Sequence, residues 1–173
     1  MKVCVAGGSG LLGRAIVPAL LDAGHEVAIL SRSKPDRDPV DARASWVAGD
    51  VTDPATLVEA LRGMDAVADA VQFPNSPVEN PKKGLTVERV DLGGTKNRVD
   101  AAEGAGVPRF IGLSGAGAAE DAKYHWLRFK WQEEQHIKAS GLTWTIFRPS
   151  WIFGPRDVSL NRFLGFARFL PFI

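Results

Sequence analysis

Three glycines between the first apolar run and the stretch after it have the spacing that a bound dinucleotide requires. They are Gly7, Gly10 and Gly13, in the segment GGSGLLG after the apolar run KVCVA at 2–6. A glycine at a strand end permits a tight turn, the second lets main-chain N–H groups approach a pyrophosphate, and the third lets a helix pack closely on the sheet. We predict dinucleotide binding here, with a purely structural turn as the alternative, through Gly7, Ser9, Gly10, Leu11, Leu12 and Gly13.

A basic pair follows the second apolar run, where the sequence reads Ser31-Arg32-Ser33-Lys34. NAD sites usually present Asp or Glu about 20 residues after the glycines, whereas NADP sites present cations to the 2′-phosphate. No carboxylate occurs here until Asp36. The planar guanidinium of Arg32 suits a phosphate, and Lys34 adds a flexible second charge. The pair therefore predicts NADP(H) in preference to NAD(H), and the alternative is an ordinary exposed basic turn.

Alternating apolar and amphipathic stretches supply a scaffold for these motifs. The patterns predict strands at 2–6, 25–31, 45–49, 65–71, 109–114 and 142–147, and helices at 11–23, 54–62, 91–104 and 123–140. This order predicts an α/β fold with a doubly wound parallel sheet of the Rossmann type. Ligands of such folds bind at the carboxyl edge of the sheet, where the proline-rich segment 72–84 is either a binding loop or a connector.

The composition argues against several classes of protein. The chain has 173 residues, 45% of them hydrophobic and 24% charged, with a net charge of +1, which favours a small-molecule or protein partner over nucleic acid. The single Cys4 is expected to be a buried thiol, and His25, His125 and His136 lack metal-ligand spacing. No apolar stretch reaches the roughly 18 residues of a membrane span. We expect a cytoplasmic protein with neither a metal site nor a transmembrane segment.

Four longer segments resemble the extended and atypical short-chain dehydrogenases/reductases. They are GGSGLLGR at 7–14, GDVTDP at 49–54, DLGGTKNRVDAAEGAGVPRFIGLS at 91–114 and SGLTWTIFRPSWIFGP at 140–155. The similarity is to the epimerase-like NAD(P)-binding branch that includes the nucleotide-binding accessory subunit of respiratory complex I. The resemblance implies that Asp50 contacts the adenine amino group and that Val51 lies over its ring. It also implies that the main chain of Ala70 and Val71 lines the cofactor and that Arg148-Pro149-Ser150 passes near the nicotinamide.

The same resemblance implies catalysis by Ser, Tyr and Lys, with Tyr four residues before Lys. That spacing sets both on one helix face, where the ammonium lowers the pKa of the phenol and orients the ribose of the cofactor, while the serine positions the substrate carbonyl. Ser114 and Lys130 match the family Ser and Lys, but Trp126, which has no ionisable hydroxyl, stands where Tyr is usual. The only tyrosine, Tyr124, lies six residues before Lys130 and so about 120° around the helix. Its own i+4 neighbour is Arg128.

Two functions remain open on this basis. One is an NADP(H)-binding oxidoreductase that acts as a reductase or epimerase on a small molecule, with Ser114, Lys130 and Tyr124 as its catalytic residues. The other is a noncatalytic dinucleotide-binding protein with a structural, assembly or redox-sensing role, which the tryptophan at position 126 favours.

The last residues form a separate feature. Four of the nine phenylalanines fall in the last 11 residues, and apolar side chains recur at helical spacing from Val158 to Leu170. We expect this amphipathic tail, 158–173, to dock on its own sheet or on a symmetric mate; a protein partner or a membrane surface is the alternative. Since the resembling proteins continue into a substrate domain, the expected division is a nucleotide domain at 1–154 and the start of a truncated substrate region at 155–173.

Overall fold

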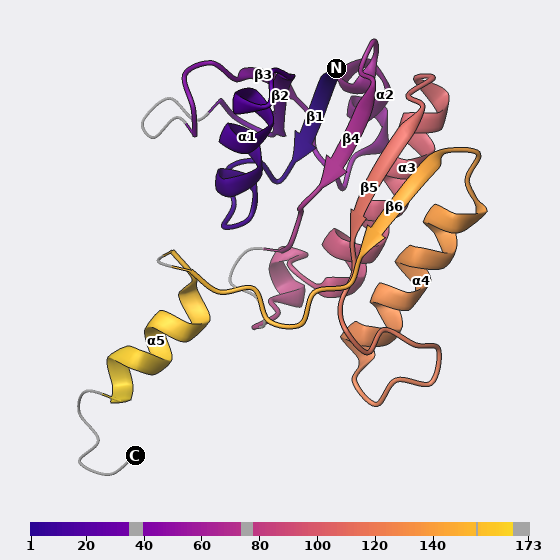
Figure 1. Ribbon diagram of the computed structural model, residues 1–173. Helices are drawn as coiled ribbons and strands as arrows, with labels where there is room; N and C mark the ends of the chain where they lie inside the picture. Colours follow the sequence, from indigo (N-terminus) through magenta and orange to yellow (C-terminus); the bar gives the residue numbers. More distant parts are fainter. Residues whose placement is uncertain (35–39, 74–77, 155, 168–173) are drawn as a thin grey trace.

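Six parallel strands form the centre of the fold (Figure 1). The computed structural model describes residues 1–34, 40–73, 78–154 and 156–167. The strand order is β3-β2-β1-β4-β5-β6, which confirms the doubly wound sheet. Its strands are β1 (Lys2–Ala6), β2 (Glu26–Ser31), β3 (Ser45–Ala48), β4 (Ala66–Asp69), β5 (Arg109–Leu113) and β6 (Thr143–Phe147). The order reverses between β1 and β4, so the carboxyl ends of these two strands flank the crevice where such sheets bind ligands.

Alternate residues along the strands pack on opposite faces of the sheet. On one face, Cys4, Val67 and Phe110 pack with helices α2 (Leu57–Leu61), α3 (Gly94–Gly104) and α4 (His125–Ala139). On the other face, Val5 and Ile29 pack with helix α1 (Gly13–Asp22), which lies over β1 and β2. The predicted strands are apolar because both faces of the central strands are covered. Burial raises the pKa of the Cys4 thiol to about 12, as expected for an inert cysteine.

Two helices differ from the sequence prediction. The helix expected from Asp91 begins earlier, with the π-helical segment η3 (Val87–Gly93), and the Thr86 side chain accepts a hydrogen bond from the Arg89 N–H at 3.1 Å. The wider π turns place Asp91 inward, where its carboxylate accepts from the Phe73 N–H at 3.1 Å. The helix expected at 54–62 is split into η1 (Pro54–Thr56) and α2, and the Asp53 side chain caps η1 by accepting from the Ala55 N–H.

The segment 72–84 and the tail are described in part. The short helix η2 (Pro81–Lys83) lies within 72–84, whose residues 74–77 are outside the described ranges. The last helix, α5 (Val158–Ala167), extends away from the sheet (Figure 1), and residues 168–170 of the predicted helix are likewise outside. None of the described helices is long and apolar enough to cross a membrane.

Candidate nucleotide-binding site

The glycine turn joins β1 to α1 at the carboxyl edge of the sheet. Gly7 has a φ of 77°, which favours glycine, and its carbonyl accepts from the Gly10 N–H at 2.9 Å. A Cβ at Gly7 would lie 2.6 Å from the carbonyl oxygen of Ala70, and one at Gly13 would overlap the Gly7 carbonyl and the Cα of Gly8. The turn, the start of α1 and the end of β4 are therefore in direct main-chain contact.

The outer side of this turn is open. Ser9, Gly10 and Leu11 are exposed, while Gly13 is buried beneath them and Leu12 is half-buried. The Arg14 side chain donates to the Ser9 carbonyl at 3.1 Å and so steadies the loop. The main-chain N–H groups at the start of α1 consequently lie at an accessible helix N-terminus, the arrangement that suits a phosphate.

Residues at the end of β4 complete the inner wall of the crevice. Ala70 donates its N–H to the Ala6 carbonyl at 2.9 Å, and Val71 donates its own to the Asp69 carboxylate at 3.1 Å. A Cβ at Gly7 would also lie 2.9 Å from the Val71 nitrogen. The structure therefore brings Gly7, Ala70 and Val71 together, as the resemblance implies.

Charged groups gather where β2 and β3 end. Arg32 and Lys34 are exposed. The Ser31 hydroxyl donates to the Ser33 carbonyl at 2.8 Å and accepts from the indole N–H of Trp46 at 2.9 Å, which holds the strand end in place. Within the described residues, this end of β2 presents two cations, while Asp36 lies outside them.

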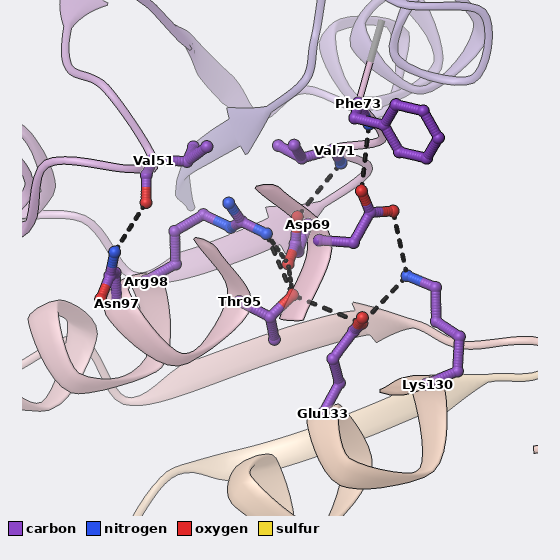
Figure 2. Close-up of polar contacts among 10 residues, drawn as sticks. Val51, Asp69, Val71, Phe73, Thr95, Asn97, Arg98, Lys130 and Glu133 are labelled. Carbon is purple, nitrogen blue, oxygen red and sulfur yellow. Dashed lines mark hydrogen bonds and ion pairs between the residues drawn. The ribbon is translucent and has the colours of Figure 1, made fainter. Parts of the chain in front are cut away.

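Asp50, which follows β3, lies near Arg32. It accepts from the N–H and the hydroxyl of Thr52, both at 2.8 Å. Burial raises the pKa of Asp50, but the two Thr52 hydrogen bonds and the charges of Arg32 and Arg89 outweigh it and lower that pKa. Arg89, on η3, is a third cation that sequence reasoning missed, because nothing in its spacing relates it to β2 or β3. The Val51 carbonyl accepts from the Asn97 side chain at 2.9 Å (Figure 2).

A buried polar cluster connects the crevice to α3. Arg98 is fully buried and donates to the Asp69 carboxylate at 2.7 Å and to the Thr95 hydroxyl at 3.1 Å (Figure 2). Thr95 in turn donates to Asp69 at 3.2 Å. The cluster was missed in the sequence because Asp69 is 29 residues from Arg98 and the motif containing Arg98 carries no charge signal of its own.

Lys130 extends this cluster from α4. Its ammonium donates to Glu133 at 2.9 Å and lies 3.6 Å from Asp91. Burial lowers the pKa of Lys130, but the two carboxylates outweigh it and raise that pKa, so the ammonium stays charged. Burial raises the pKa of Asp91, and it raises that of Glu133 to about 7 against the attraction of Lys130.

Ser114 directly follows β5. Its buried hydroxyl lies beside the Glu134 carboxylate but outside hydrogen-bonding geometry. Glu134 accepts from two nitrogens of Arg148, both at 2.6 Å, and from Lys138, four residues later on α4, at 3.0 Å. Burial raises the pKa of Glu134, but these cations lower it to about 2. The guanidinium of Arg148, in the segment expected near the nicotinamide, is thus held by α4.

Aromatic rings occupy the start of α4. Tyr124 precedes the helix as its N-cap residue, and its ring stacks on that of Trp126 with centroids 6.5 Å apart. Both rings are about half exposed, and the Trp126 ring lies against Gly115. Arg128 donates to the carbonyls of Ala122 and Lys123 at 2.7 and 3.1 Å, so its charge is directed at the main chain.

The crevice fits a dinucleotide, because the glycine turn is exposed at Ser9, Gly10 and Leu11, where main-chain N–H groups are accessible to a phosphate. Side chains at Gly7 and Gly13 would overlap the main chain of the turn and displace it. Within the described ranges, no three His, Cys, Asp or Glu side chains are grouped to hold a metal ion.

Sequence comparisons identify related proteins. A family profile described as NAD(P)H-binding matches residues 7–160. The photosystem II assembly factor Ycf39 of Synechocystis sp. is 34% identical over 149 residues, which are 86% of this chain and 44% of that protein. The NAD(P)H azoreductase of Xenophilus azovorans is 30% identical over 148 residues, 85% of this chain and 47% of that protein. The chain therefore spans less than half the length of these relatives.

Solved structures share the fold. A putative NAD-dependent epimerase/dehydratase of Bacillus halodurans superposes with a TM-score of 0.77 and 25% identity, over 91% of this chain and 74% of the other. The UDP-glucose 4-epimerase of Thermus thermophilus, in complex with NAD, gives a TM-score of 0.74 and 26% identity over 91% and 57%.

Proposed function

The chain belongs to the NAD(P)H-binding family of extended short-chain dehydrogenases/reductases, and we propose that it binds NADP(H) and acts as a reductase or epimerase on a small molecule. The observation that carries this proposal is the glycine turn. Its outer side is exposed at Ser9, Gly10 and Leu11, and its inner side packs against the main chain at Ala70. The names of the azoreductase and the epimerase among the similar proteins support a redox role.

The preference for NADP(H) rests on the cations around Asp50. The charges of Arg32 and Arg89 both help to lower the pKa of that carboxyl, so two guanidinium groups lie near the residue expected to contact the adenine. A 2′-phosphate would meet Arg32 and Lys34, and no carboxylate occurs in the described residues 31–34 at the end of β2 to bind a free 2′-hydroxyl.

In the proposed mechanism the chain orients the reactants. Bound NADPH supplies a hydride. The ammonium of Lys130, held by Glu133 and Asp91, would donate to the ribose beside the nicotinamide. The Ser114 hydroxyl would donate to the substrate oxygen, because Glu134 does not engage it in a hydrogen bond. Tyr124, the single tyrosine, would deliver the proton to that oxygen.

Replacing Arg32 by alanine is expected to weaken NADPH binding by roughly 10- to 100-fold, because a charge-assisted hydrogen bond contributes about 1.5–3 kcal/mol. Binding of NADH should change less than about twofold, since it lacks the 2′-phosphate. Isothermal titration of both nucleotides measures this. Arg62→Ala is the matched control, because Arg62 is an exposed arginine paired with Glu59 at 3.0 Å. Equal affinities of the parent protein for NADPH and NADH would contradict the preference.

A second candidate is a noncatalytic role in assembly. Two observations favour it: Trp126 stands at the usual tyrosine position, and the relative Ycf39 is an assembly factor. In that case the chain would bind the nucleotide without consuming it.

The variant Tyr124→Phe separates the two candidates. It removes the phenol that the proposed mechanism uses as the proton donor, and general acid catalysis contributes about 10²- to 10⁴-fold to rates. If the chain is a reductase that uses Tyr124, the parent should consume NADPH with a member of a panel of carbonyl compounds, and Tyr124→Phe should lower that rate at least tenfold. Trp126→Phe, which also keeps an aromatic ring at its position, is the matched control and should retain the parent rate. No NADPH consumption by the parent with any compound of the panel would favour the noncatalytic role.

A further inference from the structure

The turn between η2 and η3 brings a glycine and an arginine into close contact. Gly84 follows η2 and has a φ of 67°, a conformation that favours glycine. A Cβ at Gly84 would lie 2.6 Å from Nη1 of Arg89 and 3.1 Å from its Cζ, so the guanidinium lies against the main chain of this turn. Side chains of a helix lean toward its N-terminus, and Gly84 lies just before the N-terminus of η3.

The segment that carries Arg89 packs beside the expected place of the adenine ring. Val87 and Val90 of η3 are buried in an apolar cluster, and Val51 packs against that cluster. Val51 is the residue expected to lie over the ring. All of these residues fall within 7–160, the range that the NAD(P)H-binding profile matches, so their arrangement belongs to the nucleotide-binding unit itself.

Arg89 also lies near Asp50, the residue expected at the adenine amino group. Burial raises the pKa of that carboxyl, but two hydrogen bonds from Thr52 and the charges of Arg32 and Arg89 lower it below its ordinary value. Within the described ranges, no carboxylate forms an ion pair with the Arg89 guanidinium. Four other arginines have such a partner, namely Arg43, Arg62, Arg98 and Arg148.

We propose that Arg89 is a further cofactor-binding residue, whose guanidinium, positioned by Gly84, stacks on the adenine ring of the bound dinucleotide. The dinucleotide is that of the proposed function, on which this inference rests. A planar guanidinium stacks on aromatic rings and attracts their π-electrons within about 6 Å of the ring centre. Adenine is common to NADPH and NADH, so Arg89 would contribute to the binding of both, whereas Arg32 would favour the one with the 2′-phosphate.

The affinities of Arg89→Ala for the two nucleotides test this role. Isothermal titration should show NADPH and NADH both weakened by the same factor, roughly 3- to 30-fold. Arg62→Ala, whose arginine is paired with Glu59, should bind both as the parent does. A loss confined to NADPH would assign Arg89 to the 2′-phosphate, and unchanged affinities would leave it a structural role; either result overturns the stacking. A parent chain that binds neither nucleotide would overturn the proposed function, and this inference with it.

Two glycine substitutions test whether Gly84 positions the guanidinium. Gly63 has a similar φ of 71°, but a Cβ there would meet nothing within 4 Å. Alanine strains the backbone at both positions, yet only Gly84→Ala displaces Arg89. Gly84→Ala should therefore weaken NADPH and NADH as Arg89→Ala does, while Gly63→Ala should keep the parent affinities.

The double variant Gly84→Ala/Arg89→Ala completes the comparison. Both substitutions remove the same contact, so the loss of affinity in the double variant should equal that of Arg89→Ala alone. Circular dichroism before each titration confirms that the variants are folded. Losses that multiply in the double variant, or a folded Gly84→Ala with the parent affinities, would show that Gly84 does not position the guanidinium.

Discussion

Replacing Gly13 by alanine is expected to abolish most dinucleotide binding and to lower the free energy of unfolding by roughly 1–3 kcal/mol. Alanine is normally favoured over glycine inside a helix, by about 1 kcal/mol, so the expected sign is the reverse of the usual one. The reason is that a Cβ at this position would overlap the Gly7 carbonyl and the Gly8 Cα, which are main-chain atoms. The turn would have to move away from α1, and a shift of about 1 Å in positioning groups costs about 100-fold.

A matched control for this substitution lies on α3. A Cβ at Gly104 would be 3.8 Å from the Val58 side chain, an ordinary contact, so Gly104→Ala should leave binding unchanged and stability unchanged or raised by up to about 1 kcal/mol. Urea denaturation and titration with NADPH measure both effects. A Gly13→Ala protein as stable as the parent and with equal affinity would show that the turn is not the nucleotide cradle.

Glu133→Gln is expected to flatten the pH dependence of stability between pH 5 and pH 8. The buried cluster contains three carboxylates, on Asp69, Asp91 and Glu133, but two cations, on Arg98 and Lys130. One carboxylate is therefore in excess, and burial raises the pKa of Glu133 to about 7. The folded state holds this proton more tightly than the unfolded chain does.

The direction of the effect follows from that difference. Because the folded-state pKa is raised, the contribution of Glu133 to stability is complete below its ordinary pKa and is lost as the pH rises to about 7. The free energy of unfolding of the parent should fall from pH 5 to pH 8 by on the order of 2 kcal/mol more than that of the glutamine variant.

The neighbouring residue is the control for this measurement. The pKa of Glu134 is lowered to about 2, so this carboxylate is ionised throughout the range and Glu134→Gln should change stability equally at pH 5 and pH 8. Urea denaturation at four pH values compares the three proteins. Parallel curves for the parent and Glu133→Gln would mean that Glu133 does not bind the excess proton.

The order of strands and helices and the glycine turn were predictable from the sequence, because both depend on local patterns. Apolar runs have the length of buried strands, and a glycine spacing of three residues belongs to one strand-turn-helix. The basic pair Arg32 and Lys34 after β2 was also predictable, because its two members lie close together in the sequence. The start of η3 was not, since the extra residue in a π turn depends on which groups Asp91 meets in the folded chain.

What the sequence by itself determined is thus a Rossmann sheet with a dinucleotide turn at its first crossover. Only the tertiary structure decided which buried polar residues contact one another. Thr95 and Glu133 are 38 residues apart, and they meet because successive crossovers pack α3 and α4 on the same face of the sheet. The two faces of the sheet are divided in the same way, because α1 packs over β1 and β2 while α2, α3 and α4 lie on the opposite face. Neighbouring residues determine an element, but which side chains meet depends on how all the elements pack.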